Sequence, residues 1–271
     1  MAHTRTFDRY LSILGVGREP PTLDNLRRLV RAQIIRVPFE NISKLFLKKT
    51  ADASYIPSLE DHLDGIERFN FGGTCYANNP HFAALLRHLG YEVDLCGADM
   101  SNPDVHLVSF VHLEGREYLV DVGYAAPFYQ PLARDTDTKL EIAFGRHRYV
   151  LHPQDDLKRS RMEHIRDGEL IHGYLAKPEP REIDHFDEII RDSYSDQSTF
   201  MNVVVIERFF ADRSIRIHNL TLTESNRTGA TTTRLDDKEE LARAIVTSCG
   251  FPSEMVREAI ADVALEGNIY S

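Results

Sequence analysis

The spacing of hydrophobic residues changes near residue 95, and this change constrains the fold more than any other feature of the sequence. In the first part, apolar residues recur at intervals of three and four, which is typical of amphipathic helices. Such helices are predicted over residues 22–37 with Thr22 as N-cap, over 58–69 with Ser58 as N-cap, and through 82–89. We therefore expect a helical bundle in the amino-terminal third of the chain.

The middle of the chain instead alternates apolar and polar residues, as half-buried strands do. Asp167 and Gly168 form a hairpin signal between two such segments. The other segments that indicate strands are residues 106–113, 117–124, 203–210 and 214–223. Two closing helices are expected near the carboxyl end, the second with Ser253 as N-cap.

Residues 175–186 are rich in proline and charge, and this composition indicates a connection between lobes rather than a core segment. A chain of 271 residues exceeds a usual single domain. We expect three parts: a helical bundle over 1–94, a β-rich lobe over 95–198 and a mixed α/β lobe over 199–271.

Net charge and hydropathy exclude several function classes. A net charge of -10 disfavours a nucleic-acid-binding protein, because such proteins neutralise phosphates with lysine and arginine. No stretch is apolar enough to predict a membrane span, and the first residues lack a secretory pattern. Cys75, Cys96 and Cys249 are odd in number and far apart, which suits reduced thiols in a cytoplasmic protein. His106 and His112 lack further ligands at a recurring spacing, so no metal site is predicted.

The segments around residues 106–124 predict a pair of functional side chains. A two-residue turn after Leu113 would pair that residue with Arg116. The same register makes His106 and Asp121 diagonal neighbours on one face of the sheet, about 7–8 Å apart between Cα atoms. A four-residue turn keeps this shared face, whereas a three-residue turn does not. The alternative is that both residues merely mark strand ends.

A histidine held by a carboxylate, beside a cysteine, is suited to nucleophilic acyl transfer. The carboxylate orients the imidazole, and the imidazolium stabilises the thiolate that attacks a carbonyl carbon. Cys75 follows two glycines, which let the backbone bend closely and present amide donors to an oxyanion. Cys96 lies at a predicted strand end and Cys249 near a helix end, so both are interpreted as buried structural residues.

Five short motifs in order extend this interpretation over nearly the whole chain. They are RVPFENIS at residues 36–43, GGTCYAN at 72–78, HLVSFV at 106–111, YLVDVGY at 118–124 and a following PL at 131–132. Their order resembles that of the arylamine N-acetyltransferase family.

The resemblance implies a Cys75, His106 and Asp121 triad like that of cysteine proteases. It implies a multi-lobe α/β fold, made of a helical bundle, a central β-barrel and a carboxyl-terminal α/β lid. It also implies ping-pong transfer of acetyl from acetyl-CoA, a co-substrate, to an arylamine or hydrazine. By the same analogy, the acceptor pocket is lined by Phe39, Met100 and Tyr124. The resemblance assigns no residue to contacts with coenzyme A.

The chain departs from the family pattern around the nucleophile. Phe71 stands where the family has an arginine that pairs with the glutamate of PFEN, here Glu40. Since an unpaired buried carboxylate is costly, Glu40 is neutral or exposed, or Arg36 replaces the missing partner. The chain also departs from the family pattern at Thr74, Ala77 and Ala125.

Proline at residue 80 gives conflicting signals about the helix after Cys75. Taken locally, Asn79 is the N-cap and Pro80 the first helical residue, which leaves Cys75 one turn upstream. The resemblance instead favours a kinked helix that starts earlier. We expect the earlier start.

Three alternatives to acetyl transfer remain at this point. The chain could be an amide synthase or use another acyl donor, because such enzymes resemble the same family. A cysteine protease usually has a different motif order. A non-catalytic binding protein is the third alternative, opened by Phe71, Ala77 and Ala125.

Overall fold

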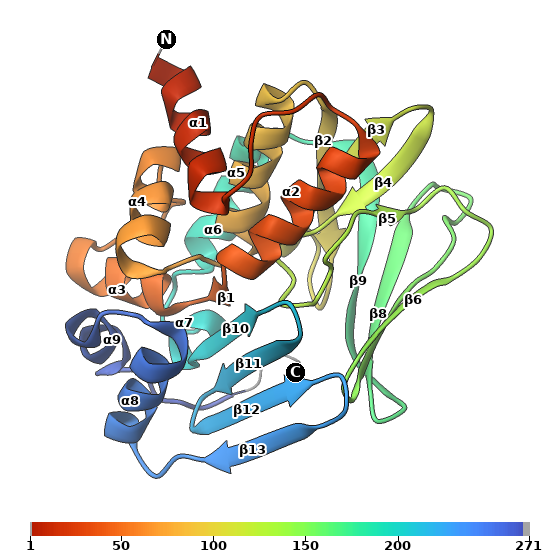
Figure 1. The fold of residues 1–271 in the computed structure, drawn as a ribbon. Helices are drawn as coiled ribbons and strands as arrows, with labels where there is room; N and C mark the ends of the chain where they lie inside the picture. The colour runs from red at the N-terminus through yellow and green to blue at the C-terminus, as the bar shows by residue number, and fades with distance from the viewer. Residues whose placement is uncertain (1, 268–271) are drawn as a thin grey trace.

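The computed structural model describes residues 2–267 and has a mixed α/β fold (Figure 1). Five helices form the amino-terminal part: α1 (Ala2–Leu14), α2 (Leu23–Arg36), α3 (Ile42–Ala51), α4 (Leu59–Phe69) and α5 (Cys75–His88). Thr22 and Ser58 cap α2 and α4 as predicted, each accepting a hydrogen bond from the backbone N–H three residues later. No helix of the described residues is both long and apolar enough to span a membrane.

An eight-stranded, barrel-like sheet forms the middle of the molecule. Its strand order within residues 2–267 is β5-β4-β3-β2-β9-β8-β7-β6. The bounds are β2 (Glu92–Asp99), β3 (His106–Leu113), β4 (Arg116–Val120), β5 (Leu132–Ala133), β6 (Leu140–Phe144), β7 (His147–Leu151), β8 (Ser160–Arg166) and β9 (Glu169–Pro180).

A five-stranded sheet, ordered β1-β10-β11-β12-β13 within the described residues, forms the third part. Its strands are β1 (Phe39–Glu40), β10 (Val205–Phe209), β11 (Arg213–His218), β12 (Thr221–Asn226) and β13 (Ala230–Arg234). The connecting and closing helices are η1 (Ile183–Phe186), α6 (Asp187–Asp192), α7 (Thr199–Asn202), α8 (Lys238–Cys249) and α9 (Ser253–Ile260). Because β1 comes from the amino-terminal part, this sheet joins segments distant along the chain. The exact division into three lobes stays a prediction.

The predicted hairpins are present. Leu113 pairs with Arg116, and the β3–β4 ladder runs in that register to Ser109 and Val120. The Asp167-Gly168 turn joins β8 to β9 with positive φ at both residues. The segment 214–223 is two strands rather than one, because a turn with Asn219 at φ 49° interrupts it.

Two sequence-based interpretations are wrong. Residues 175–186 enter the core instead of only linking lobes: Ala176 pairs with Ala98 in the sheet, and Phe186 is fully buried. Prolines are tolerated there because the strand's outer end is partly exposed. Ser253 is the first residue of α9 rather than its cap, a position that Pro252 occupies.

The helix after the glycines starts at Cys75 and contains Pro80. The local signal for a start at Asn79 is therefore wrong, and the earlier start is right. Burial of apolar side chains stabilises the helix more than the missing N–H of Pro80 destabilises it, since Phe82, Leu85 and Leu86 are almost completely buried. They pack against strands β2 and β3, which places the start of α5 beside the hairpin.

Candidate active site

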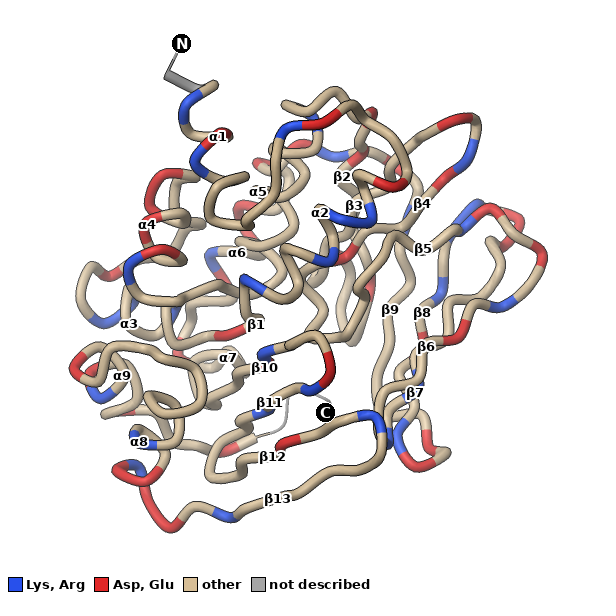
Figure 2. Tube along the Cα trace, in the orientation of Figure 1, with Lys and Arg blue, Asp and Glu red and all other residues tan. Residues whose placement is uncertain are grey.

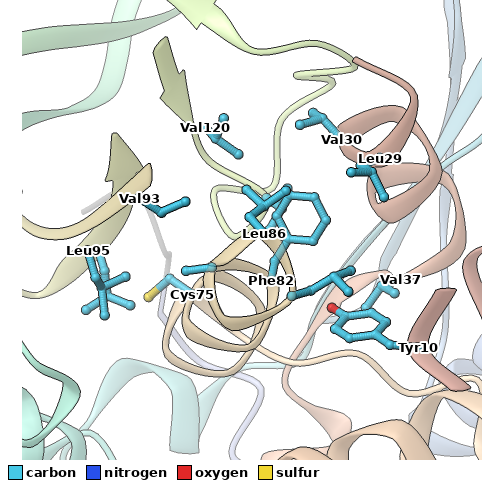
Figure 3. Close-up of a cluster of buried hydrophobic side chains, with 14 of the residues drawn as sticks. Tyr10, Leu29, Val30, Val37, Cys75, Phe82, Leu86, Val93, Leu95 and Val120 are labelled. Atoms are coloured by element: carbon cyan, nitrogen blue, oxygen red, sulfur yellow. The ribbon is translucent and has the colours of Figure 1, made fainter. Parts of the chain in front are cut away.

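Cys75 is the first residue of α5, directly after the extended N-cap residue Thr74. Only 7% of Cys75 is exposed. Figure 3 shows its side chain at the margin of the apolar cluster, with the sulfur on the side of Leu95, while Phe82 and Leu86 continue the helix. The first turn of a helix presents N–H groups and the positive end of the helix dipole, so this position favours an anion on the sulfur.

Glycines allow this helix start to contact two other segments closely. A Cβ atom on Gly72 would lie 1.9 Å from the carbonyl oxygen of Pro38. On Gly123, just after the β3–β4 hairpin, a Cβ atom would lie 2.7 Å from the Cα of Cys75. Both positions therefore require glycine, and the second was not recognised as part of the site from the sequence.

The hairpin brings His106 and Asp121 together. The Nε2 atom of His106 lies 2.8 Å from Oδ2 of Asp121, and the side chains are 2% and 0% exposed. Burial lowers the pKa of His106, but the charge and hydrogen bond of Asp121, with a hydrogen bond to Cys75, raise it to about 10. The raised pKa favours the protonated imidazole at neutral pH, and the contact between His106 and Asp121 is the pair that the sequence predicts.

Asn79 ties the helix of Cys75 to this pair. Its Nδ2 donates to Oδ1 of Asp121 at 3.0 Å and to the carbonyl of Leu107 at 2.6 Å. Its Oδ1 accepts from the N–H of Val122 at 2.9 Å. The local sequence signal marks Asn79 only as a candidate helix N-cap. Its spacing of four residues from Cys75, on the same helix face, was the signal available.

The profile of the N-acetyltransferase family matches residues 22–254 of this chain. The chain belongs to the arylamine N-acetyltransferase family. The resemblance found in the five sequence motifs is thereby confirmed.

Individual arylamine N-acetyltransferases and related enzymes are similar at modest identity. Proansamycin X synthase of Amycolatopsis mediterranei is 31% identical over 137 residues, which are 46% of this chain and 51% of that protein. Human arylamine N-acetyltransferase 1 is 30% identical over 137 residues, which are 46% of each protein. The chain spans about half the length of the curated relatives it matches.

The fold is shared over almost the whole length. The arylamine N-acetyltransferase of Mycobacterium marinum, solved in complex with CoA, superposes with a TM-score of 0.80 at 22% identity. The superposition covers 95% of this chain and 99% of that one. It shows the same mixed α/β architecture with the barrel-like sheet.

The three residues predicted to line the acceptor pocket occupy two places in this arylamine N-acetyltransferase fold. Tyr124 lies beside the imidazole, with its ring centroid 5.6 Å from that of His106, and Met100 packs against the same apolar cluster. Phe39 belongs to a separate cluster, where its ring lies 6.0 Å from that of Phe200. Their role toward a ligand stays a prediction.

Glu40 is fully buried and does not pair with Arg36, which instead donates to groups at the end of α4. Its carboxyl group accepts hydrogen bonds from the N–H and hydroxyl of Ser43, at 2.9 and 2.6 Å, and from the N–H of Gly72 at 3.0 Å. Burial raises the pKa of Glu40 despite these bonds, which favours the neutral form. Of the three alternatives, exposure and pairing with Arg36 are wrong. The side chain of Phe71 packs in an apolar cluster.

The other two cysteines are buried in apolar surroundings, as expected. Burial raises the pKa of Cys96 to about 12 and that of Cys249 to about 12. His112 bonds with Asp94 at 2.8 Å on the outer part of the hairpin. Among residues 2–267, no three His, Cys, Asp or Glu side chains are grouped so as to hold a metal ion.

A basic cavity of 350 Å³ lies between the β7–β8 ends and strands β11–β13. Arg146, Arg166 and Arg216 line it, and Asp167 is the one carboxylate among the described lining residues. Burial together with these guanidinium groups lowers the pKa of His147 to about 4. Figure 2 shows acidic and basic positions interspersed along the whole trace. The sequence could not place this cluster, because only the sheet topology gathers it.

Proposed function

We propose that this chain is an arylamine N-acetyltransferase that transfers an acetyl group from acetyl-CoA, through a thioester on Cys75, to an arylamine, hydrazine or similar amine. The observation that carries the proposal is the buried imidazole of His106, which hydrogen-bonds both Asp121 and Cys75 at the start of α5. Membership of the family supports the same reaction class.

In the first half-reaction, the Cys75 sulfur attacks the carbonyl carbon of the acetyl thioester. The bond between that carbon and the coenzyme sulfur breaks, and the coenzyme thiolate leaves with the proton held by His106. Backbone N–H groups in the first turn of α5 stabilise the negative oxygen of the tetrahedral intermediate. Asp121 keeps the imidazole oriented throughout.

In the second half-reaction, the amine nitrogen attacks the acetyl-Cys75 carbonyl carbon. His106 accepts the proton that the nitrogen loses, the bond from carbon to the Cys75 sulfur breaks, and the amide product leaves. The sulfur and the imidazolium then return to their starting ion pair, which gives ping-pong kinetics.

The basic cavity is suited to bind the phosphate groups of the donor, because guanidinium groups pair with phosphate in bidentate geometry. Stacked or tilted rings connect it to the imidazole: His147 lies 5.0 Å from His164, which lies 6.4 Å from Tyr124. Tyr124 in turn is 5.6 Å from His106. This row of rings runs from the basic cavity to the imidazole that the proposal places beside the thiol.

The proposal is tested by intact-mass analysis after mixing the protein with acetyl-CoA. We expect one acetyl adduct, which disappears when an arylamine is added and which the Cys75→Ala variant does not form. Absence of the adduct from the folded protein at saturating acetyl-CoA would show that the chain binds ligands without this chemistry.

A second candidate is transfer of a different acyl group, or amide synthesis, by the same three residues. The names of two relatives support this candidate. They are Proansamycin X synthase and the N-malonyltransferase FDB2 of Fusarium pseudograminearum, which is 30% identical over 121 residues. Mixing the protein with malonyl-CoA and acetyl-CoA in equal amounts distinguishes the donors by the mass of the adduct.

A further inference from the structure

A second cavity, of 390 Å³, lies on the other side of the first turn of α5 from the thiol. It is enclosed by α3, α4, the glycine segment before α5, and the residues that follow α6. Thr74, Tyr76 and Ala77 line it, whereas Cys75 between them directs its sulfur to His106. Its volume lies within the range of small-molecule sites, roughly 300–1,000 Å³. It is therefore separate from the reaction centre proposed above.

Two cations line this cavity: the exposed Arg68, which lies 3.7 Å from Asp64, and the buried Lys44 of α3. Its side chain is buried, with 7% of the residue exposed. The Nζ atom bonds to the hydroxyl of Ser193 at 2.6 Å and lies 4.1 Å from the ring centroid of Tyr194. Within residues 2–267 no carboxylate forms an ion pair with it. A buried ammonium group without a counter-ion is costly, so the cavity lacks an anion that a ligand can supply.

The pKa of Lys44 reflects this lack of a counter-ion. Burial lowers it to about 8, and the interaction with Cys75 offsets only part of the effect. At neutral pH the group is still mainly protonated and can donate to a carboxylate. Asp61 and Asp64 at the cavity rim are engaged elsewhere, Asp61 with Ser58 and Asp64 with Arg9.

A second polar group in the wall also has no partner. His62 of α4 is 3% exposed, and its Nε2 atom forms no hydrogen bond with any group in the described part of the chain. Burial, with a contribution from His81, holds the pKa of His62 well below its usual range, so the ring is neutral. Buried polar atoms in native proteins almost always have a partner, and this atom is free to bond a polar substituent of a ligand.

The remaining wall is largely aromatic and apolar. The rings that contribute to it are those of Phe46, Tyr55, Phe69, Phe71, Tyr76 and Tyr194. Aromatic side chains prefer to pack against another ring at offset or edge-on geometry. The cavity thus combines one buried cation, one neutral hydrogen-bonding group and surfaces suited to a flat ring.

We propose that this cavity is a binding site for an aromatic carboxylate, with Lys44 pairing with the carboxylate and the aromatic wall holding the ring. A charge-assisted hydrogen bond of this kind is strong, particularly in buried surroundings. The site is independent of the thioester chemistry, because its polar groups are Lys44 and His62 rather than Cys75 and His106.

The test is calorimetric titration with benzoate and with its neutral isostere benzamide, in the absence of any acyl donor. We expect benzoate to bind at least about tenfold more tightly than benzamide to the wild type. The Lys44→Met variant loses this preference, whereas Lys48→Met, one turn further along the same helix and not among the residues that line the cavity, keeps it. The Cys75→Ala variant binds benzoate as the wild type does, which separates this site from the proposed reaction.

A measurement on the wild type alone guards against misfolding of the Lys44 variant. Benzoate should raise the unfolding midpoint, and benzamide at the same concentration should not. Equal binding of the two compounds, unchanged benzoate binding by folded Lys44→Met, or loss of binding in Cys75→Ala would each overturn the proposal.

Discussion

The side-chain amide of Asn79, one helical turn beyond Cys75, donates a 3.0 Å hydrogen bond to the carboxylate of Asp121. Two segments 42 residues apart are thereby locked together at the point where the imidazole must meet the sulfur. The carboxylate thus receives one hydrogen bond from the helix of Cys75 and another from His106. Orientation of the proposed triad depends on the helix as much as on the hairpin.

Replacing Asn79 by alanine tests this dependence. The change leaves the carbonyl of Leu107 and the N–H of Val122 without their buried partner, so we expect a loss of about 2–4 kcal/mol in the free energy of unfolding. Acetyl transfer should fall more than stability alone explains. Denaturant unfolding and the rate of thioester formation measure the two effects. The exposed residue Asn102 supplies the control, and Asn102→Ala should change neither.

Asp121→Asn addresses the carboxylate itself. The amide retains the shape but cannot hold the imidazolium or fix its tautomer, so we expect thioester formation to slow by about 10³–10⁴-fold. The neighbouring strand β2 provides a matched control, because its Asp94 bonds to His112 at the same 2.8 Å distance in a partly exposed place. Asp94→Asn should leave the rate within about twofold. Equal losses in the two variants would contradict the proposed role of Asp121.

The raised pKa of His106 predicts how stability depends on pH. In the unfolded chain this histidine titrates near 6.5, and in the folded protein near 10. The folded state binds more protons between these values, so the stabilisation is complete below about pH 6.5 and is lost as the pH rises through about 10. The difference in unfolding free energy between the wild type and His106→Gln should therefore shrink steadily over this interval. Unfolding titrations at several pH values measure it.

The register of the β3–β4 hairpin could be predicted because it depends on local signals. A two-residue turn fixed which residues face each other, and the period of two placed His106 and Asp121 on one face. Helix caps at Thr22 and Ser58 were predictable for the same reason. The local signal alone misplaced the start of α5, since burial of Phe82 and its neighbours overrides the preference of Pro80, whereas the family resemblance indicated the earlier start.

Groups that only the fold assembles could not be predicted. Arg146 of the β6–β7 turn, Arg166 of β8 and Arg216 of β11 meet in the basic cavity. Likewise, nothing in the sequence around Lys44 shows that its ammonium group is buried without a carboxylate. Charged residues are mostly exposed, so a single lysine in a helix is read as solvated until its surroundings are known.

The buried carboxyl group of Glu40 gives a prediction of the same sign as that of His106, in a more acidic pH range. Burial raises its pKa above the ordinary value of 4.5, so the folded state binds more protons than the unfolded state above that pH. Wild-type stability should fall, relative to Glu40→Gln, as the pH rises from about 4.5 toward neutrality. Unfolding of both proteins is compared at the two ends of this range.

Glu207 is the contrasting residue for that experiment. It is also buried, but it forms an ion pair with Arg216. Glu207→Gln removes the charge that pairs with Arg216 and should lower the free energy of unfolding at neutral pH by about 3 kcal/mol. A similar loss in Glu40→Gln would show that Glu40 is ionised in the folded protein.

The close approach of Gly123 to the nucleophile predicts that its replacement by alanine stops the reaction. The new Cβ atom would lie 2.7 Å from the Cα of Cys75 and 2.7 Å from Nδ2 of Asn79, so either the helix start or the hairpin end must move. Reactivity of a triad depends on placement within a fraction of an ångström, and displacements of about 1 Å cost about 10²-fold in rate. We expect at least that loss in thioester formation, together with slower alkylation of Cys75 by iodoacetamide. Gly229→Ala, where no atom lies within 4 Å of the added Cβ, is the matched control and should keep both rates. Full activity in Gly123→Ala would mean that the sulfur and the imidazole do not need this contact to meet.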